Sequence, residues 1–152
     1  SEMCIRDRLD AQRILNTDAA IMFADLLPIM EPMGLELDYV EKVGPVFSNP
    51  VRSQKDVEKL RVVEAEVGTP YIEHTVKNIL SELPKEIALI GFAGAPWTLA
   101  CYMIEGRGSK DFINTRKALW NSNNWFMELI ETLSNYIAEK LEIHNYYFSS
   151  LQ

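Results

Sequence analysis

The sequence predicts an α/β fold with parallel strands. Two apolar runs, Ala19–Ala24 and Ile87–Phe92, lack polar alternation, as is typical of parallel strands covered on both faces. Long stretches with helical periodicity separate the two runs, and this order favours strands joined by crossover helices. The chain has 152 residues, whereas a complete (β/α)8 barrel needs about 250. It is therefore either a small α/β domain or part of a barrel.

A short β-hairpin is predicted after the first run. Leu9–Leu15, before that run, has only weak helical character. Leu35–Val40 and Val43–Phe47 flank a polar pair, Glu41-Lys42, and the first of these segments alternates between apolar and polar residues. Asn49-Pro50 then marks a turn.

Two helices are predicted between the hairpin and the second run. Ser53 is a possible N-cap, with Asp56 three residues further on. Pro70 can open a longer helix, which Pro84 stops. The apolar positions of that helix recur at helical spacing: Ile72, Val76, Ile79, Leu80 and Leu83.

Three helices are predicted after the second run. Pro96–Met103 forms a short one that the Gly106/Gly108 pair ends, and Ser109 can cap another that reaches about Trp120. The strongest pattern covers Asn123–Ile143, whose apolar stripe is Trp125, Phe126, Leu129, Ile130, Leu133, Tyr136, Ile137 and Leu141. The aromatic residues expected in the core are Trp97, Trp120, Trp125 and Phe126.

Composition excludes several classes of function. The formal net charge is −7 and no Lys/Arg cluster stands out, so neither nucleic acid nor an anionic membrane surface is an expected partner. Cys4 and Cys101 have no CxxC spacing and suit a reducing compartment, so we expect a cytoplasmic protein. His74 and His144 belong to no metal-binding motif and are expected to be ordinary helix-face residues, so no metal site is predicted.

Two segments were compared with the patterns of a membrane span and a signal peptide, and neither fits. Ile87–Ile104 has no charged residue, but its glycines and Pro96 favour a strand, a turn and a helix start over a membrane span. The first eight residues, Ser1–Arg8, have no apolar core of a signal peptide. They resemble a translated sequencing adapter, so we expect a non-native leader followed by one partial domain over residues 9–152.

The segment GFAGAPWT, Gly91–Thr98, lies where the second run ends and a helix begins. Gly91 and Gly94 would let backbone approach a ligand, and N–H groups at the start of the helix favour a carboxylate or phosphate. The alternative is a tight turn that serves only packing, and the spacing alone weights the two evenly.

Two polar side chains lie near the ends of the predicted strands. Asp25 follows the first run and is either a ligand-facing carboxylate or a turn cap. Tyr102 lies five residues after Trp97 and either offers its hydroxyl to a ligand or packs in the core. The residue pattern alone favours the structural role for both, more clearly for Tyr102 than for Asp25.

Three motifs resemble the uroporphyrinogen decarboxylase family. They are AIMFADL (Ala20–Leu26) with the MGLE that follows, GPVF with PVR (Gly44–Arg52), and IGFAGAPWTLACYMIEG (Ile90–Gly106). The resemblance extends over nearly the whole chain, from about Leu9 to Lys140, with the motifs in the family's order.

The resemblance implies a partial (β/α)8 TIM barrel, roughly its second to third βα units with a small β-hairpin insertion. It implies a homodimer that removes four acetate carboxyls from uroporphyrinogen III, giving coproporphyrinogen III, with no metal or organic cofactor. Asp25 matches the aspartate that binds pyrrole N–H groups and stabilises the cationic intermediate. Tyr102, Phe23, Phe92 and Gly94 match positions that contact substrate or line the cleft.

Parts of the family pattern have no counterpart in this sequence. The arginine-rich segment that binds substrate carboxylates and the later serine and histidine of the cleft are not found, and His144–Gln152 does not match. We therefore expect the chain alone to be inactive. The alternatives are a related corrinoid-dependent methyltransferase barrel and a non-catalytic partial domain that binds a tetrapyrrole.

Overall fold

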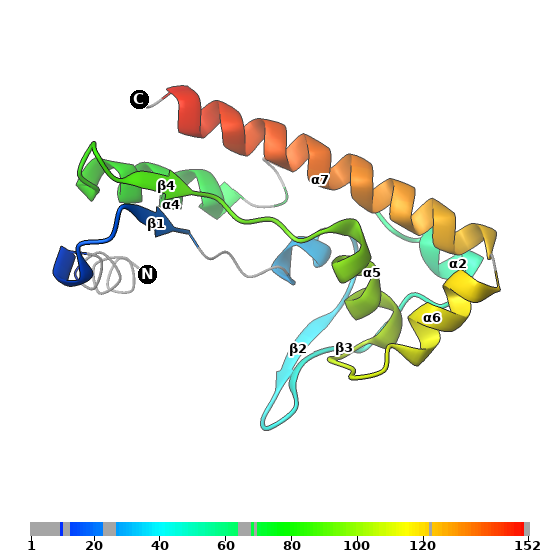
Figure 1. The fold of residues 1–152 in the computed structure, drawn as a ribbon. Helices are drawn as coiled ribbons and strands as arrows, with labels where there is room; N and C mark the ends of the chain where they lie inside the picture. Colours follow the sequence, from blue (N-terminus) through cyan, green and yellow to red (C-terminus); the bar gives the residue numbers. More distant parts are fainter. Residues whose placement is uncertain are drawn as a thin grey trace.

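The computed structural model describes residues 10, 13–22, 27–63, 68, 70–121 and 123–150. Within these ranges, the side chains at positions 28, 70, 72, 73, 140 and 142–150 are not described. The helices and strands follow one another along the chain as Figure 1 shows. In order they are β1 (Ala19–Ile21), η1 (Pro28–Met30), β2 (Leu37–Val40), β3 (Gly44–Phe47), α2 (Gln54–Val57), α4 (Pro70–Glu82), β4 (Ala88–Ile90), α5 (Pro96–Glu105), α6 (Ile113–Trp120) and α7 (Asn124–Ser150).

The strands form two separate pairs. β1 lies parallel to β4, with Ala19 opposite Ala88 and Ile21 opposite Ile90. β2 and β3 form the predicted antiparallel hairpin. The parallel pairing of strands far apart in the sequence confirms the α/β prediction, and the long segment between them supplies the crossover.

One face of the parallel pair is covered by α4. Met22, just after β1, and Val76 on α4 are buried together, and Ile79, Leu80 and Leu89 pack against them. The sequence predicted strands covered on both faces, and this is wrong for the described residues: the side chains of Ile21 and Ile90 are 65% and 47% exposed. The opposite face of the pair has no covering helix among the described elements (Figure 1).

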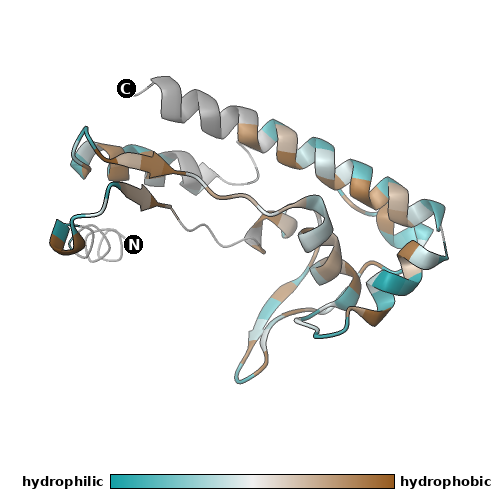
Figure 2. Cartoon of the chain, viewed as in Figure 1, coloured by the Kyte–Doolittle hydropathy of each residue, from teal (hydrophilic) through white to brown (hydrophobic). Residues whose placement is uncertain are grey.

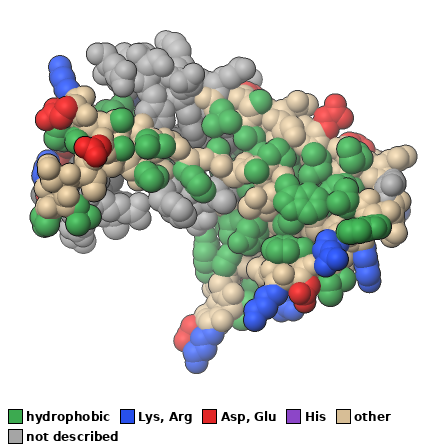
Figure 3. Space-filling model, in the orientation of Figure 1, with side chains coloured by type: hydrophobic (Ala, Val, Ile, Leu, Met, Phe, Trp, Pro, Cys, Tyr) green, Lys and Arg blue, Asp and Glu red, His purple; other side chains and the backbone are tan. Residues whose placement is uncertain are grey.

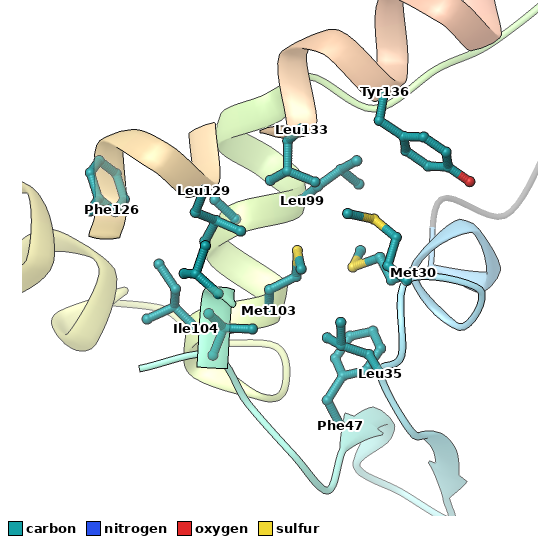
Figure 4. Packing of buried hydrophobic residues seen from close by; sticks show 14 of the residues in the cluster. Met30, Leu35, Phe47, Leu99, Met103, Ile104, Phe126, Leu129, Leu133 and Tyr136 are labelled. Atoms are coloured by element: carbon teal, nitrogen blue, oxygen red, sulfur yellow. The ribbon is translucent and has the colours of Figure 1, made fainter. Parts of the chain in front are cut away.

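The main core lies between α5, α7 and the hairpin side of the molecule. α5 packs against α7. The coloured part of α7 alternates between hydrophobic and hydrophilic residues along its length (Figure 2). Figure 4 shows side chains from α5 and α7 pointing toward Met30, Leu35 and Phe47. The fully buried members of this core include Met30, Met33, Leu99, Met103, Leu129, Leu133 and Tyr136.

The stripe predicted on the last helix is confirmed at five of its positions, and α7 continues beyond the predicted end at Ile143 to Ser150. Those five buried residues are Phe126, Leu129, Leu133, Tyr136 and Ile137, whereas Leu141 is 48% exposed. Two aromatic residues expected in the core are not buried: Trp97 is 43% exposed and Trp120 is 74% exposed. Trp120 instead lies at the surface, where the guanidinium of Arg116 is 5.7 Å from the centroid of its ring.

The two predicted serine caps differ in detail. Ser53 is the N-cap of α2, but its hydroxyl donates to Asp56 Oδ2 at 2.7 Å and not to the backbone. α6 begins after Phe112, which has a left-handed backbone with φ 48°. Ser109 Oγ accepts a hydrogen bond from Phe112 N at 3.0 Å, so the serine holds the turn before the helix.

Candidate functional site

The carboxyl ends of β1 and β4 lie at the same edge of their sheet. Their register is parallel, and the N–H of Met22, just past β1, donates to the carbonyl of Ile90 at 2.9 Å. As far as the chain is described, the two strands therefore end side by side. In α/β folds this edge is where ligands bind, and both segments singled out by the sequence start there.

The segment after β4 leads directly into α5. Ala95 is the extended N-cap, Pro96 takes the first helical position, and Leu99 N donates to the carbonyl of Ala95 at 3.1 Å. Gly94 is buried, whereas Phe92 is 39% exposed. Neither Gly91 nor Gly94 is among the glycines of the described chain with positive φ, so a left-handed backbone is not the reason for glycine here.

α5 holds this turn against the rest of the molecule. Trp97 meets Phe126 of α7 edge to face, with ring centroids 6.0 Å apart. Leu99 and Met103 of the same helix are fully buried. The turn is therefore built on a rigid element, as a binding site requires.

Tyr102 is half-buried on α5 and packs against the main core. It lies six residues after Pro96, which is about 9 Å along a helix. Packing on the core accounts for the ring. Because the side chain is only partly buried, packing does not exclude a contact between the hydroxyl and a ligand, and that role stays a prediction. Phe92 and Gly94 are thus placed together in the turn, with Tyr102 further along the helix that the turn begins.

Asp25 and Phe23 lie outside the described residues. The strand that precedes them in the sequence, β1, and the residue that follows it, Met22, are described, and both run toward the edge where the Gly91–Ala95 turn begins. The roles expected for Asp25 and Phe23 stay predictions.

Sequence reasoning missed a second polar region, at the other end of α5. An open cavity of about 530 Å³ there is lined by Arg52, Arg107 and Lys110 together with Glu105, Ser109 and Asn114. The three cations are separated in the sequence, so no cluster was visible. The only sequence signal for this region was the short spacing between Arg107 and Lys110, just after Gly106. Arg52 joins these two cations only in the folded chain.

Glu105 is the anionic side chain of this region. Its Oε1 accepts from the backbone N and from Oγ1 of Thr115, both at 3.0 Å, and its Oε2 accepts from Asn114 Nδ2 at 2.8 Å. Burial alone would raise the pKa of Glu105, but these donors outweigh it and the pKa is lowered from 4.5. The carboxylate is thus held in its charged form.

The described residues also bear on metals and membranes. They contain no group of three or more His, Cys, Asp or Glu side chains that could hold a metal ion. No helix among them is both long and apolar enough to span a bilayer. His74 is exposed on α4 beside Asn78, as expected of a helix-face residue, whereas the side chain of His144 is not described.

Comparison with known proteins identifies the family. The model of the uroporphyrinogen decarboxylase family matches residues 1–145. This chain belongs to that family. Named relatives include the uroporphyrinogen decarboxylase of Geobacter sulfurreducens, 49% identical over 121 residues, and that of Trichlorobacter lovleyi, 47% identical over 121 residues. The enzyme of Pelobacter propionicus is 42% identical over 146 residues.

The match covers most of this chain but a smaller part of each relative. The alignments span 80% of the chain and 35% of the Geobacter sulfurreducens decarboxylase, and 92% of the chain and 42% of the Pelobacter propionicus protein. The shape is also similar to that of a methyltransferase from Methanosarcina mazei, with a TM-score of 0.66 and 16% sequence identity. That likeness covers 89% of this chain and 39% of the methyltransferase, and it concerns the fold alone.

Proposed function

We propose that this chain is the part of a uroporphyrinogen decarboxylase that carries the cation-stabilising side of the active site. The protein would remove the four acetate carboxyls of uroporphyrinogen III in porphyrin biosynthesis, giving coproporphyrinogen III. The observation that carries the proposal is the GFAGAPWT turn, set between β4 and α5 at the edge where β1 also ends. Relatives that share this stretch of chain at up to 49% identity are named decarboxylases of this substrate.

The chemistry asks for stabilisation of a cation. Protonation beside a pyrrole ring turns the substrate itself into the electron sink, into which the electrons of the breaking C–CO2 bond flow. Asp25 would accept hydrogen bonds from the pyrrole N–H groups and stabilise that positive charge. No metal or organic cofactor is required in this scheme, because the substrate supplies the sink.

The described residues have supporting roles in the proposal. Phe92 presents an exposed ring at the turn and would form an apolar wall against the macrocycle, together with Phe23. Gly94 would let the substrate approach the backbone, since it adds no side chain. Tyr102 would donate its hydroxyl to a substrate carboxylate while its ring stays packed on the core.

The finer architecture belongs to the same proposal. β1 and β4 would be the second and third strands of a (β/α)8 barrel, with β2 and β3 as an insertion in the connection between them. The face of the strand pair that α4 does not cover would face the interior of the closed barrel, because the helices of such a barrel lie outside its strands. A cytoplasmic homodimer is the expected assembly, and residues 9–152 the expected extent of the barrel portion.

The corrinoid-dependent methyltransferase alternative is not favoured. The similarity to the Methanosarcina mazei methyltransferase is one of shape at 16% identity, whereas the decarboxylases share 42–49% of aligned residues. A non-catalytic tetrapyrrole-binding domain would account for the turn. It would not account for 42–49% sequence identity with named decarboxylases over most of the chain.

The test is product formation by the full reading frame that contains this chain. The purified protein would be incubated anaerobically with uroporphyrinogen III, and the products oxidised and separated by number of carboxyl groups. We expect coproporphyrin, preceded by intermediates with seven, six and five carboxyls, and no loss of activity with a metal chelator. No carboxyl loss from a folded protein would refute the proposal. We also expect no conversion by the 152-residue chain alone.

A further inference from the structure

The cavity at the carboxyl end of α5 has an excess of positive charge. Arg52, Arg107 and Lys110 line it against one carboxylate, Glu105. Both oxygens of Glu105 are engaged by donors of Asn114 and Thr115. The ion pairs among the described residues, Arg13 with Asp10 and Lys59 with Asp56, involve none of the three cations. This local excess contrasts with the formal charge of −7 for the whole chain.

The positive charge is held in a preorganised frame. Arg52 Nε donates to the carbonyl of Ile104 at 3.0 Å, and its Nη2 donates to that of Glu105 at 3.2 Å. These bonds fix the guanidinium over the last turn of α5 and satisfy carbonyls that the helix end leaves open. The plane of the guanidinium is thus set before any ligand arrives, which lowers the entropic cost of binding.

The opposite wall is anchored as well. Arg107 pairs with Val46 in an isolated antiparallel bridge, and the N–H of Phe47 donates to the carbonyl of Gly106 at 2.7 Å. The Arg107 and Lys110 side chains themselves are exposed, so they can close on a ligand. In Figure 3, Lys and Arg side chains gather over the hairpin and the segment around α6.

The lining indicates the chemical class of the ligand. Apart from Val43 and Gly108, it is made of charged and polar side chains, so an apolar ligand would gain little from binding here. Guanidinium groups match the geometry of carboxylate and phosphate oxygens, and a lysine adds a mobile charge. A volume of about 530 Å³ accommodates an anion with several charged groups.

We propose that this cavity binds a small multivalent oxyanion, a phosphate or a polycarboxylate, through Arg52, Arg107 and Lys110. It lies at the end of α5 away from the Gly91–Ala95 turn, about 15 Å along the ten-residue helix. The inference thus goes beyond the proposed decarboxylation and does not depend on it.

The test is a titration of the 15N-labelled full chain followed by NMR. Inorganic phosphate and citrate would be added in separate titrations at constant ionic strength. A third titration with sodium chloride alone would measure the effect of rising salt, because exposed charges are screened by salt. The reporters are the Gly108 amide and the Asn114 side-chain amide, which line the cavity. We expect saturable shifts with phosphate or citrate but not with chloride. The ligand that binds more tightly shows whether the cavity prefers a phosphate or a polycarboxylate.

Variants connect the shifts to the cations. Arg107→Gln combined with Lys110→Gln should weaken binding by about tenfold or more. Lys85→Gln, which removes one positive charge in the turn before β4, should leave binding unchanged. Lys110→Gln alone changes only an exposed side chain and is the fallback if the double variant loses spectral dispersion. The proposal is overturned if chloride produces the same shifts, if nothing saturates, or if the cavity variants bind as tightly as Lys85→Gln.

Discussion

The carboxylate of Glu105 at the end of α5 caps the start of α6 by accepting two hydrogen bonds from Thr115. One comes from the backbone N–H and one from the hydroxyl, both at 3.0 Å. Thr115 is fully buried, so its polar atoms depend on this partner. The contact joins two helices across the turn that contains Gly106, and it forms one wall of the cation-lined cavity.

The first prediction concerns the charge of Glu105. Glu105→Gln should lower the free energy of unfolding by about 1–2 kcal/mol at neutral pH, since a charged acceptor is replaced by a neutral one. The pKa of Glu105 is lowered in the folded state, so its contribution is present above the ordinary value of 4.5 and is lost as pH falls through the folded pKa. Urea unfolding should therefore separate wild type and variant at about pH 7 and bring them progressively closer as the pH falls below 4.5. A difference that is independent of pH would contradict this account.

A second prediction concerns Gly106, whose φ is +78°. A Cβ there would meet the carbonyl oxygen of Phe47 and Cβ of Pro50, both at 3.3 Å. Gly106→Ala should therefore destabilise the fold by about 1–3 kcal/mol, from backbone strain and crowding together. Gly108→Ala is the matched control, because nothing lies within 4 Å of its added Cβ. An equal shift in melting temperature for both variants would show that the positive φ and the crowding at position 106 are not the cause.

A third prediction concerns the packing of α7 on α5. Leu129 is fully buried in the main core, so Leu129→Ala should lower stability by about 2–5 kcal/mol through lost burial and a residual cavity. Leu141 lies on the same helix but is 48% exposed, and Leu141→Ala should change stability by less than about 1 kcal/mol. Denaturant unfolding of the two variants measures the difference, and similar losses would show that α7 is not held through this stripe.

The fourth prediction concerns Cys101, a buried free thiol. Burial raises the pKa of Cys101, which the hydrogen bond with Thr115 only partly offsets and the nearby Glu105 charge raises further. Because the thiolate is the reactive form, Cys101 should react with iodoacetamide much more slowly at neutral pH than in the unfolded chain. Peptide mapping after timed labelling measures this rate. Labelling of Cys101 in the folded chain at the unfolded rate would contradict its burial.

Sequence patterns predicted the helices well because helical periodicity reports the buried face directly. Leu129, Leu133 and Tyr136 are all fully buried, as their spacing indicated. The turn of the hairpin and the start of α5 at Pro96 followed from local backbone chemistry in the same way.

Strand burial and charge clustering could not be predicted in this way. An apolar run such as Ile87–Phe92 shows that a strand can be covered, but not whether a helix lies on each face, and Ile90 is 47% exposed. Arg52 lines the same cavity as Arg107 only because the residues after β3 lie beside the end of α5, a tertiary contact that no local pattern encodes. Trp120 was expected in the core but lies at the surface beside Arg116, because an aromatic residue type alone does not show which side of a helix is buried. The roles of Asp25 and Phe23, and the boundary at residue 8, stay predictions.

The edge where β1 and β4 end is the proposed place of the decarboxylation chemistry. Asp25 follows the carboxyl end of β1, whereas Asp18 is exposed just before its amino end, so the two aspartates form a matched pair. In the full reading frame, Asp25→Asn and Asp18→Asn would be compared with wild type by the initial rate of coproporphyrinogen formation. The account predicts that Asp25→Asn lowers turnover by about two orders of magnitude or more while Asp18→Asn leaves it unchanged. A folded Asp25→Asn enzyme with wild-type turnover would contradict it.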